Sequence, residues 1–186
     1  MKKIILASGS PRRQQLLKEL GFEFAVEVKP VDETAPKGLK AQEIPLYLSQ
    51  LKAAQFKNTV DENTVVITAD TIVWINEKEI GKPKDYADAI NMLKTLSGNM
   101  HEVFTGVTLT SKNKTHSFFV TTKVFFKQLT EEEIKYYLDN YKPFDKAGSY
   151  GIQEWLGYIG IEKIEGSYFN VMGLPLKELY EELGKY

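Results

Sequence analysis

The apolar and polar positions of this chain predict a sheet whose strands alternate with helices. Stretches with a strand-like pattern, either a short apolar run or a strict alternation, occur at residues 4–7, 22–28, 65–74, 103–110, 115–127 and 159–164. The stretch 65–74 begins with a continuous β-branched run, which is expected of a strand buried on both faces. The stretches on either side of the polar turn Ser111–Lys114 predict a long antiparallel hairpin.

Apolar residues at helical spacing predict five helices, beginning near residues 11, 42, 86, 131 and 176. Ser10 is a suitable N-cap for the first, because Pro11 then occupies the first helical position, where a missing N–H costs nothing. Asp85 is expected to cap the third helix. Thr130 and Glu133 form the sequence pattern of a capping box at the start of the fourth.

The length of 186 residues allows one sizeable core. Because no repeat, linker or low-complexity segment interrupts the pattern, residues 1–186 are predicted to form a single domain. No apolar run approaches the roughly 20 residues that a membrane span needs, and the apolar residues before Ser8 are too few for a signal peptide. We therefore expect a cytoplasmic protein that does not bind membranes.

Charge and composition exclude several classes of function. The net charge of −1 provides no global basic field, which argues against a nucleic-acid-binding protein. The chain has no cysteine, so thiolate nucleophiles and Cys-ligated zinc are excluded. Its two histidines, His101 and His116, fall in strand-like stretches far from the Gly-rich segments, which argues against a His-based triad or a multi-His metal site.

The strongest candidate for chemistry is the loop that joins the first strand to the first helix, with Ser8, Ser10, Arg12 and Arg13. The first turn of a helix offers free N–H groups and a positive dipole end, which bind phosphate. Solvated arginines are the alternative interpretation. Two arginines in a first turn oppose the helix dipole, however, so an anion-binding site is favoured.

Asp70 is the second candidate, because it interrupts an apolar strand and is expected at that strand's end. An unpaired buried carboxylate is costly, and in open α/β sheets ligands bind beyond strand ends. A structural aspartate with satisfied hydrogen bonds is the alternative. The functional interpretation is favoured because no helix cap or turn follows that would use the side chain.

Other charged residues leave two interpretations open. Glu33 lies in a long loop and by itself is best interpreted as a solvated carboxylate. Lys52 lies beside the apolar stripe of its helix, either along the surface or towards an anion in a cleft. Lys82 and Lys84 are either surface charge or a second phosphate-binding loop. The segment 145–153 contains two glycines that allow close approach of a ligand.

Taken together, several cations with few carboxylates suit a polyphosphate bound with a divalent cation. Carboxylate oxygens favour Mg²⁺ or Mn²⁺, which usually also contact substrate phosphates. The P-loop pattern GxxxxGK[ST] and the dinucleotide pattern GxGxxG are both absent.

The chain resembles the Maf family of nucleoside triphosphate pyrophosphatases, and the matching blocks run in family order across nearly the whole sequence. These blocks are Ile5–Arg13, Ala69–Val73, Lys82-Pro83, Leu96-Ser97-Gly98, Asp145–Gln153 and Gly173-Leu174-Pro175. Met172, where a smaller aliphatic residue is more usual, is a conservative departure. The resemblance implies an α/β domain with a central twisted mixed sheet flanked by helices and a deep cleft, related to inosine triphosphate pyrophosphatases.

The resemblance also implies hydrolysis of a nucleoside triphosphate to the monophosphate and pyrophosphate, with Mg²⁺ or Mn²⁺. Asp70 is then the catalytic carboxylate, and Asp70 and Glu33 are the candidate metal ligands. The substrate-binding residues implied are Ser8, Arg12, Arg13, Glu33, Lys52, Thr71, Lys82 and Gln153.

Three of these positions, Arg12, Thr71 and Gln153, match the branch of the family that acts on dTTP and UTP. The branch acting on 7-methyl-GTP would carry Trp, Gln and Glu there. The amide of Gln153 offers a donor and an acceptor side by side, which matches the N3–H and O4 edge of uracil or thymine.

Two other functions are weighed against this one. A nucleotide-binding regulator of septum formation would use the same pocket without turnover. A phosphatase with Asp70 as covalent nucleophile would need a second aspartate where this chain has Ile72. The sequence leaves open the preferred pyrimidine, the role of Asp70 as base or metal ligand, and the oligomeric state, with a homodimer as one option.

Overall fold

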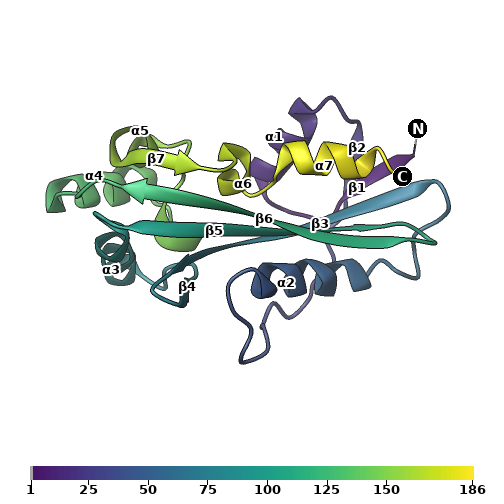
Figure 1. Cartoon of the computed structure of the whole chain (residues 1–186), viewed down its shortest axis with the longest axis horizontal. Coiled ribbons are helices and arrows are strands. Elements are labelled where there is room, and N and C mark those ends of the chain that lie inside the picture. The colour runs from purple at the N-terminus through teal and green to yellow at the C-terminus, as the bar shows by residue number, and fades with distance from the viewer. Residues whose placement is uncertain (1) are drawn as a thin grey trace.

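The computed structural model describes residues 2–186 and is built on a mixed seven-stranded sheet (Figure 1). Its strands are β1 (Lys3–Leu6), β2 (Phe24–Val26), β3 (Thr64–Ile75), β4 (Lys78–Ile80), β5 (Met100–Thr110), β6 (Thr115–Phe126) and β7 (Ile161–Glu165). They follow the spatial order β2-β1-β3-β5-β6-β7, and β4 pairs with β3. β1 runs parallel to both of its neighbours, whereas β3, β5, β6 and β7 pair antiparallel.

Helices cover both faces of this sheet. They are α1 (Pro11–Glu19), α2 (Glu43–Ala54), α3 (Tyr86–Leu96), α4 (Glu131–Tyr141), α5 (Trp155–Gly160), α6 (Tyr168–Met172) and α7 (Leu176–Leu183), with a 3₁₀ turn, η1 (Ala147–Ser149). In Figure 1, α2 lies on one side of the long strands and α1, α6 and α7 lie on the other. The expected α/β architecture with a central mixed sheet flanked by helices is confirmed.

The apolar pattern of each element matches the face that it buries. Leu16 and Leu17 of α1 and Leu176 and Leu179 of α7 are buried in one cluster with residues of β1, β3 and β5. Across the sheet, α2 packs its own apolar residues in a separate cluster with Ile72 and other residues of the opposite face. A third cluster joins α3, α4 and α5 to the far end of the sheet.

One edge of β3 is left unpaired along part of its length. The parallel pairing with β1 ends at Leu6 and Ile67, and the antiparallel pairing with β4 begins at Val73 and Ile80. Residues 68–72 therefore hydrogen-bond only to β5 within the sheet. Asp70 and Thr71, two of the candidate site residues, lie at this unpaired edge.

The predicted helix starts are confirmed by the side-chain caps. Ser10 accepts from Arg13 N, Asp85 accepts from Asp88 N, and Thr130 forms the full capping box with Glu133. The hairpin is confirmed, with β5 and β6 paired from Met100 and Phe125 to Thr110 and Thr115.

Three strand predictions differ from the structure. Asp70 lies in the middle of β3 and not at its end, because β3 continues past it to pair with β4. The second strand is limited to Phe24–Val26, the residues that pair with β1. The last strand begins at Ile161, since the preceding residues form α5. Within α5, Gly157 packs so tightly on the carbonyl of Ile152 that a Cβ would lie 1.9 Å from its oxygen.

Across residues 2–186, no helix is long and apolar enough to cross a membrane.

Candidate active site

The unpaired edge of β3 opens into a cleft of about 550 Å³. Its walls come from the β1–α1 loop, α2, the loop after β4, the segment 145–153 and the end of α6. All the site residues expected from the sequence line this one cleft: Ser8, Arg12, Arg13, Glu33, Lys52, Asp70, Thr71, Lys82 and Gln153. Lys84 is not among the lining residues, so the surface-charge interpretation fits it better.

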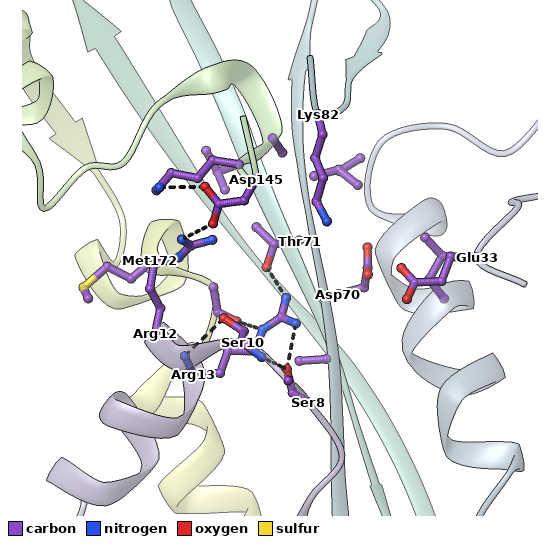
Figure 2. A pocket seen from close by; sticks show the side chains of 18 of the residues that line it. Ser8, Ser10, Arg12, Arg13, Glu33, Asp70, Thr71, Lys82, Asp145 and Met172 are labelled. Carbon is purple, nitrogen blue, oxygen red and sulfur yellow. Dashed lines mark hydrogen bonds and ion pairs between the residues drawn. The ribbon is translucent and has the colours of Figure 1, made fainter. Parts of the chain in front are cut away.

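Arg13 is held from three directions. Its Nε donates to Gly173 O at 2.7 Å, and its two terminal nitrogens donate to Ser8 Oγ at 3.4 Å and Thr71 Oγ1 at 3.0 Å (Figure 2). Burial lowers the pKa of Arg13, an effect that the charge of Asp70 partly opposes. Within residues 2–186 no carboxylate lies within 4.0 Å of this guanidinium, so a half-buried positive charge faces the cleft without an ion-pair partner.

A chain of buried hydroxyls fixes Thr71 beneath Arg13. Thr71 Oγ1 lies 2.9 Å from Thr105 Oγ1, and Thr105 donates to the backbone oxygen of Asn170 at 3.0 Å. Thr105 and Asn170 are both fully buried. The C-terminal end of α6 therefore anchors both Arg13, through Gly173, and Thr71.

Asp70 and Thr71 project to opposite faces of the sheet, because side chains alternate along a strand. Thr71 contacts Arg13 on the α1 side, and Asp70 contacts Lys52 on the α2 side. Both side chains still reach the cleft, since one edge of β3 has no neighbouring strand at this point. Figure 2 shows Asp70 and Thr71 on the two sides of the β3 ribbon, with Lys82 entering between them.

Lys52 links the two carboxylates assigned to the site. Its Nζ lies 2.6 Å from Asp70 Oδ1 and 3.2 Å from Glu33 Oε2. The side chains of Lys52 and Asp70 are only 14% and 13% exposed, so this is a largely buried ion pair that still reaches solvent. The solvated-loop interpretation of Glu33 is incomplete: the side chain is exposed, but it points to Lys52.

Asp70 and Glu33 provide hard oxygen ligands that converge on a single positive charge. Mg²⁺ typically takes one or two protein carboxylates and completes its shell with water and substrate phosphates. Residues 2–186 contain no cluster of three or more His, Cys, Asp or Glu side chains suited to a metal ion. The donor set thus fits a cation shared with a phosphorylated ligand, and does not form an all-protein cage.

Glu79 of β4 also lines the cleft and is missed by the sequence interpretation. Partial desolvation, followed by the negative charge of Asp70, raises its pKa. The only sequence signal is its place in a polar turn, which does not distinguish a lining residue from a solvated one.

Arg12 and Gln153 mark the other end of the cleft. Arg12 Nη1 lies 3.4 Å from Asp145 Oδ2. Gln153 is half-buried, and its side-chain amide makes no hydrogen bond within the described residues, although Tyr158 donates to its backbone oxygen. A free amide on a cleft wall is available to a ligand that pairs a donor with an acceptor.

The cleft therefore has two chemically different regions. Its centre presents Arg13, Lys82 and the positive end of the α1 helix dipole, which suit a polyanion. Another part of the lining presents the Gln153 amide, which suits a polar planar group. Figure 2 shows Asp70 on the opposite side of the Arg13 guanidinium from Arg12.

Comparison with known proteins gives strong matches over the full chain. The family model described as "Maf-like protein" matches residues 3–186. The dTTP/UTP pyrophosphatase of Christiangramia forsetii is 54% identical, covering 97% of this chain and 92% of that protein. The dTTP/UTP pyrophosphatase of Phocaeicola vulgatus is 55% identical, covering 98% and 95%.

Two solved structures are more distant. The Ham1 protein of Staphylococcus aureus has a TM-score of 0.49 at 16% identity, covering 67% of this chain and 72% of its own. A nucleoside-triphosphatase, a dITP/XTP pyrophosphatase, of Mycobacterium abscessus has a TM-score of 0.44 at 14% identity, covering 98% and 94%.

Proposed function

This chain belongs to the Maf family, and we propose that it hydrolyses dTTP, UTP and related pyrimidine nucleoside triphosphates to the nucleoside monophosphate and pyrophosphate. The observation that carries the proposal is the convergence on one cleft of the half-buried Arg13 guanidinium, the Lys82 ammonium and an aspartate that pairs with Lys52. The names of the relatives support the choice of substrate.

The triphosphate lies at the centre of the cleft. Arg13 retains donors beyond the three that it gives to Gly173, Ser8 and Thr71. Lys82 makes no ion pair or side-chain hydrogen bond within residues 2–186 and points into the cleft (Figure 2). These cations, with the positive end of the α1 helix dipole and with Lys52, neutralise the phosphate charge, and positioning and neutralisation supply most of the rate.

Asp70 acts as the proton acceptor. Lys52 fixes one carboxylate oxygen at 2.6 Å, which leaves the second oxygen to orient a water molecule. The water attacks the α-phosphorus in line, its proton passes to Asp70, and the bond from the α-phosphorus to the bridging oxygen breaks. Pyrophosphate leaves, and no covalent intermediate forms.

Mg²⁺ or Mn²⁺ is part of this proposal, with Asp70 and Glu33 as the residues that would hold it. A divalent cation bound there would neutralise phosphate oxygens and help to align the triphosphate. Glu33, which already reaches the Asp70–Lys52 pair at 3.2 Å, would remain close to the substrate phosphates.

The base lies at the Gln153 end. The amide of Gln153 donates to O4 and accepts from N3–H of uracil or thymine, and Arg12 and Thr71 flank the nucleotide. This edge-to-edge pairing is expected to contribute about 1–3 kcal/mol to selectivity, the cost of leaving a buried polar group without a partner.

A panel of triphosphates tests the proposal. The chain is incubated with dTTP, UTP, ATP and 7-methyl-GTP, with Mg²⁺, with Mn²⁺ and with a chelator, and pyrophosphate is measured separately from orthophosphate. We expect pyrophosphate from dTTP and UTP only when a divalent cation is present. Orthophosphate alone would indicate cleavage of the outer bond and contradict the assignment.

Matched lysine variants make the test specific to the cleft. Lys82→Ala removes a charge from the cleft and should lower kcat/KM, whereas Lys84→Ala removes a charge of the same loop outside the cleft and should not. Tight binding of UTP without turnover would favour the alternative function, a nucleotide-binding regulator of septum formation.

A further inference from the structure

A short turn carries Gln153 into the cleft. Glu154 N donates to Gly151 O at 3.1 Å, which closes the turn from Gly151 to Glu154 with Gln153 inside it. The backbone at Gly151 lies so close to the Glu154 side chain that a Cβ there would be 2.8 Å from its Cδ. The position of Gln153 therefore depends on how the two ends of this turn are held.

A single hydroxyl holds both ends. The hydroxyl of Tyr137, in α4, accepts from Gly151 N at 3.0 Å and donates to Glu154 Oε2. The Tyr137 side chain is fully buried and does not line the cleft. Burial and the neighbouring Glu154 carboxylate raise the pKa of Tyr137 well above its usual value, so the phenol stays protonated and keeps its donor.

A series of ion pairs connects Glu154, at one end of the turn, to Arg12. Glu154 Oε1 lies 3.1 Å from Lys146 Nζ, and the same ammonium lies 2.8 Å from Asp145 Oδ1. The other oxygen of Asp145 lies 3.4 Å from Arg12 Nη1. The Lys146 and Glu154 side chains are only 11% and 20% exposed, which strengthens their ion pair relative to surface pairs, whereas Asp145 is 64% exposed.

We propose that Tyr137 is a positioning residue for base recognition, because its hydroxyl fixes the turn that presents Gln153 and, through Glu154, the ion pairs that restrain Arg12. This inference rests on the proposed function, in which Gln153 and Arg12 meet the nucleotide. Tyr137 itself touches no substrate. Its effect therefore falls on nucleotide binding and base selectivity and not on the reacting phosphorus.

The matched variants are Tyr137→Phe and Tyr141→Phe, both on α4. Tyr137→Phe removes the hydroxyl and keeps the ring that stacks on Tyr141 at 5.2 Å. The Tyr141 side chain is 39% exposed, and its hydroxyl has no hydrogen-bond partner among residues 2–186, so Tyr141→Phe is the control. Glu154→Gln, which keeps the side-chain size but removes the charge, tests the same turn from its other end.

Steady-state kinetics measure the functional effect. For Tyr137→Phe we expect kcat/KM for UTP to fall about tenfold, mainly through KM, and the ratio of UTP to 7-methyl-GTP turnover to fall with it. Glu154→Gln should change the same two quantities, and Tyr141→Phe neither. If Tyr137→Phe lowers only the melting temperature, with KM and the ratio unchanged, the residue is merely structural and the inference is wrong.

Two readouts without turnover separate this inference from the proposed function. Amide hydrogen exchange of residues 151–154 should speed up in Tyr137→Phe and stay unchanged in Tyr141→Phe; equal protection in both variants would contradict the inference. Calorimetric binding of a non-hydrolysable UTP analogue should weaken about tenfold in Tyr137→Phe. If the parent binds the analogue with this difference but releases no pyrophosphate from UTP, the proposed function fails and the positioning role stands. A parent that does not bind the analogue overturns both.

Discussion

The ammonium group of Lys52 lies 2.6 Å from Oδ1 of Asp70, although the two residues come from a helix and a strand on either side of the cleft. The pair is largely buried, and a buried charge that loses its partner is strongly destabilising. Lys52 therefore holds Asp70 in one orientation, with the second carboxylate oxygen left for a ligand or for water.

Replacing Asp70 by asparagine should abolish turnover and preserve binding. The amide would keep the shape of the side chain but could not accept a proton, and general base catalysis typically supplies about 10²–10⁴-fold. We expect kcat for UTP to fall by that factor, with little change in the affinity for a non-hydrolysable analogue. A variant that hydrolyses UTP at the parent rate would remove Asp70 from the mechanism.

Exchange of Gln153 for Glu should change base selectivity. An ionised carboxylate has only acceptors, so it loses the donor to O4 of uracil and gains an acceptor for purine N–H groups. We expect the ratio of UTP to 7-methyl-GTP turnover to fall by about 5- to 150-fold, from loss of a buried polar pairing worth about 1–3 kcal/mol. An unchanged ratio would show that the amide does not contact the base.

Gly173→Ala should impair catalysis more than its effect on stability explains. Gly173 has φ = +111°, and a Cβ there would lie 3.5 Å from both Arg13 Nε and Thr71 Oγ1. The positive φ is expected to cost about 1–2 kcal/mol in folding free energy. A backbone shift that relieves this strain would move the Gly173 carbonyl that accepts from Arg13 Nε, and should lower kcat/KM about 10- to 100-fold.

Gly38→Ala is the control for that variant. Gly38 has φ = +102°, but a Cβ added there would meet no atom within 4 Å, and the residue lies in the exposed loop before α2. Denaturant melts of both variants measure the cost of the strained backbone in folding free energy, and UTP kinetics measure the effect on the geometry of the site. Equal activities at equal stability would mean that Arg13 is not positioned through Gly173.

His101 should make folding stability depend on pH in the mildly acidic range. Burial lowers its pKa from 6.5 to about 4, so the unfolded chain binds a proton at a higher pH than the folded one. The contribution of neutral His101 to the free energy of unfolding is then fully present above about pH 6.5. It is lost as the pH falls towards 4, by up to about 3 kcal/mol. Urea melts from pH 7 to 4.5 should show a shallower loss in His101→Gln than in the parent.

His116→Gln is the matched control for the pH dependence. His116 is far more exposed and lies 3.4 Å from Glu182, so its replacement should leave the steep loss of the parent in place. If the free energy of unfolding falls equally with pH in the parent and in His101→Gln, the buried imidazole does not account for the acid sensitivity.

The sequence by itself determined most of the local structure and the chemistry of the site. The caps at Ser10, Asp85 and Thr130 depend on a few adjacent residues, and the β5–β6 hairpin depends on alternation about a short turn. The family blocks contain many of the residues that line the cleft, and the match over residues 3–186 confirms the family.

Only the tertiary structure decided how these residues meet. Periodicity tells which face a strand buries but not which of its edges stays unpaired, so the sequence predicts Asp70 at the end of β3, whereas it lies at an open edge in the middle. Glu79 and Tyr137 carry no local signal, because Glu79 is placed by the pairing of β4 with β3 and Tyr137 by its hydrogen bonds to the Gly151–Glu154 turn. Such contacts join residues far apart in the chain, and they are fixed by the packing of whole elements.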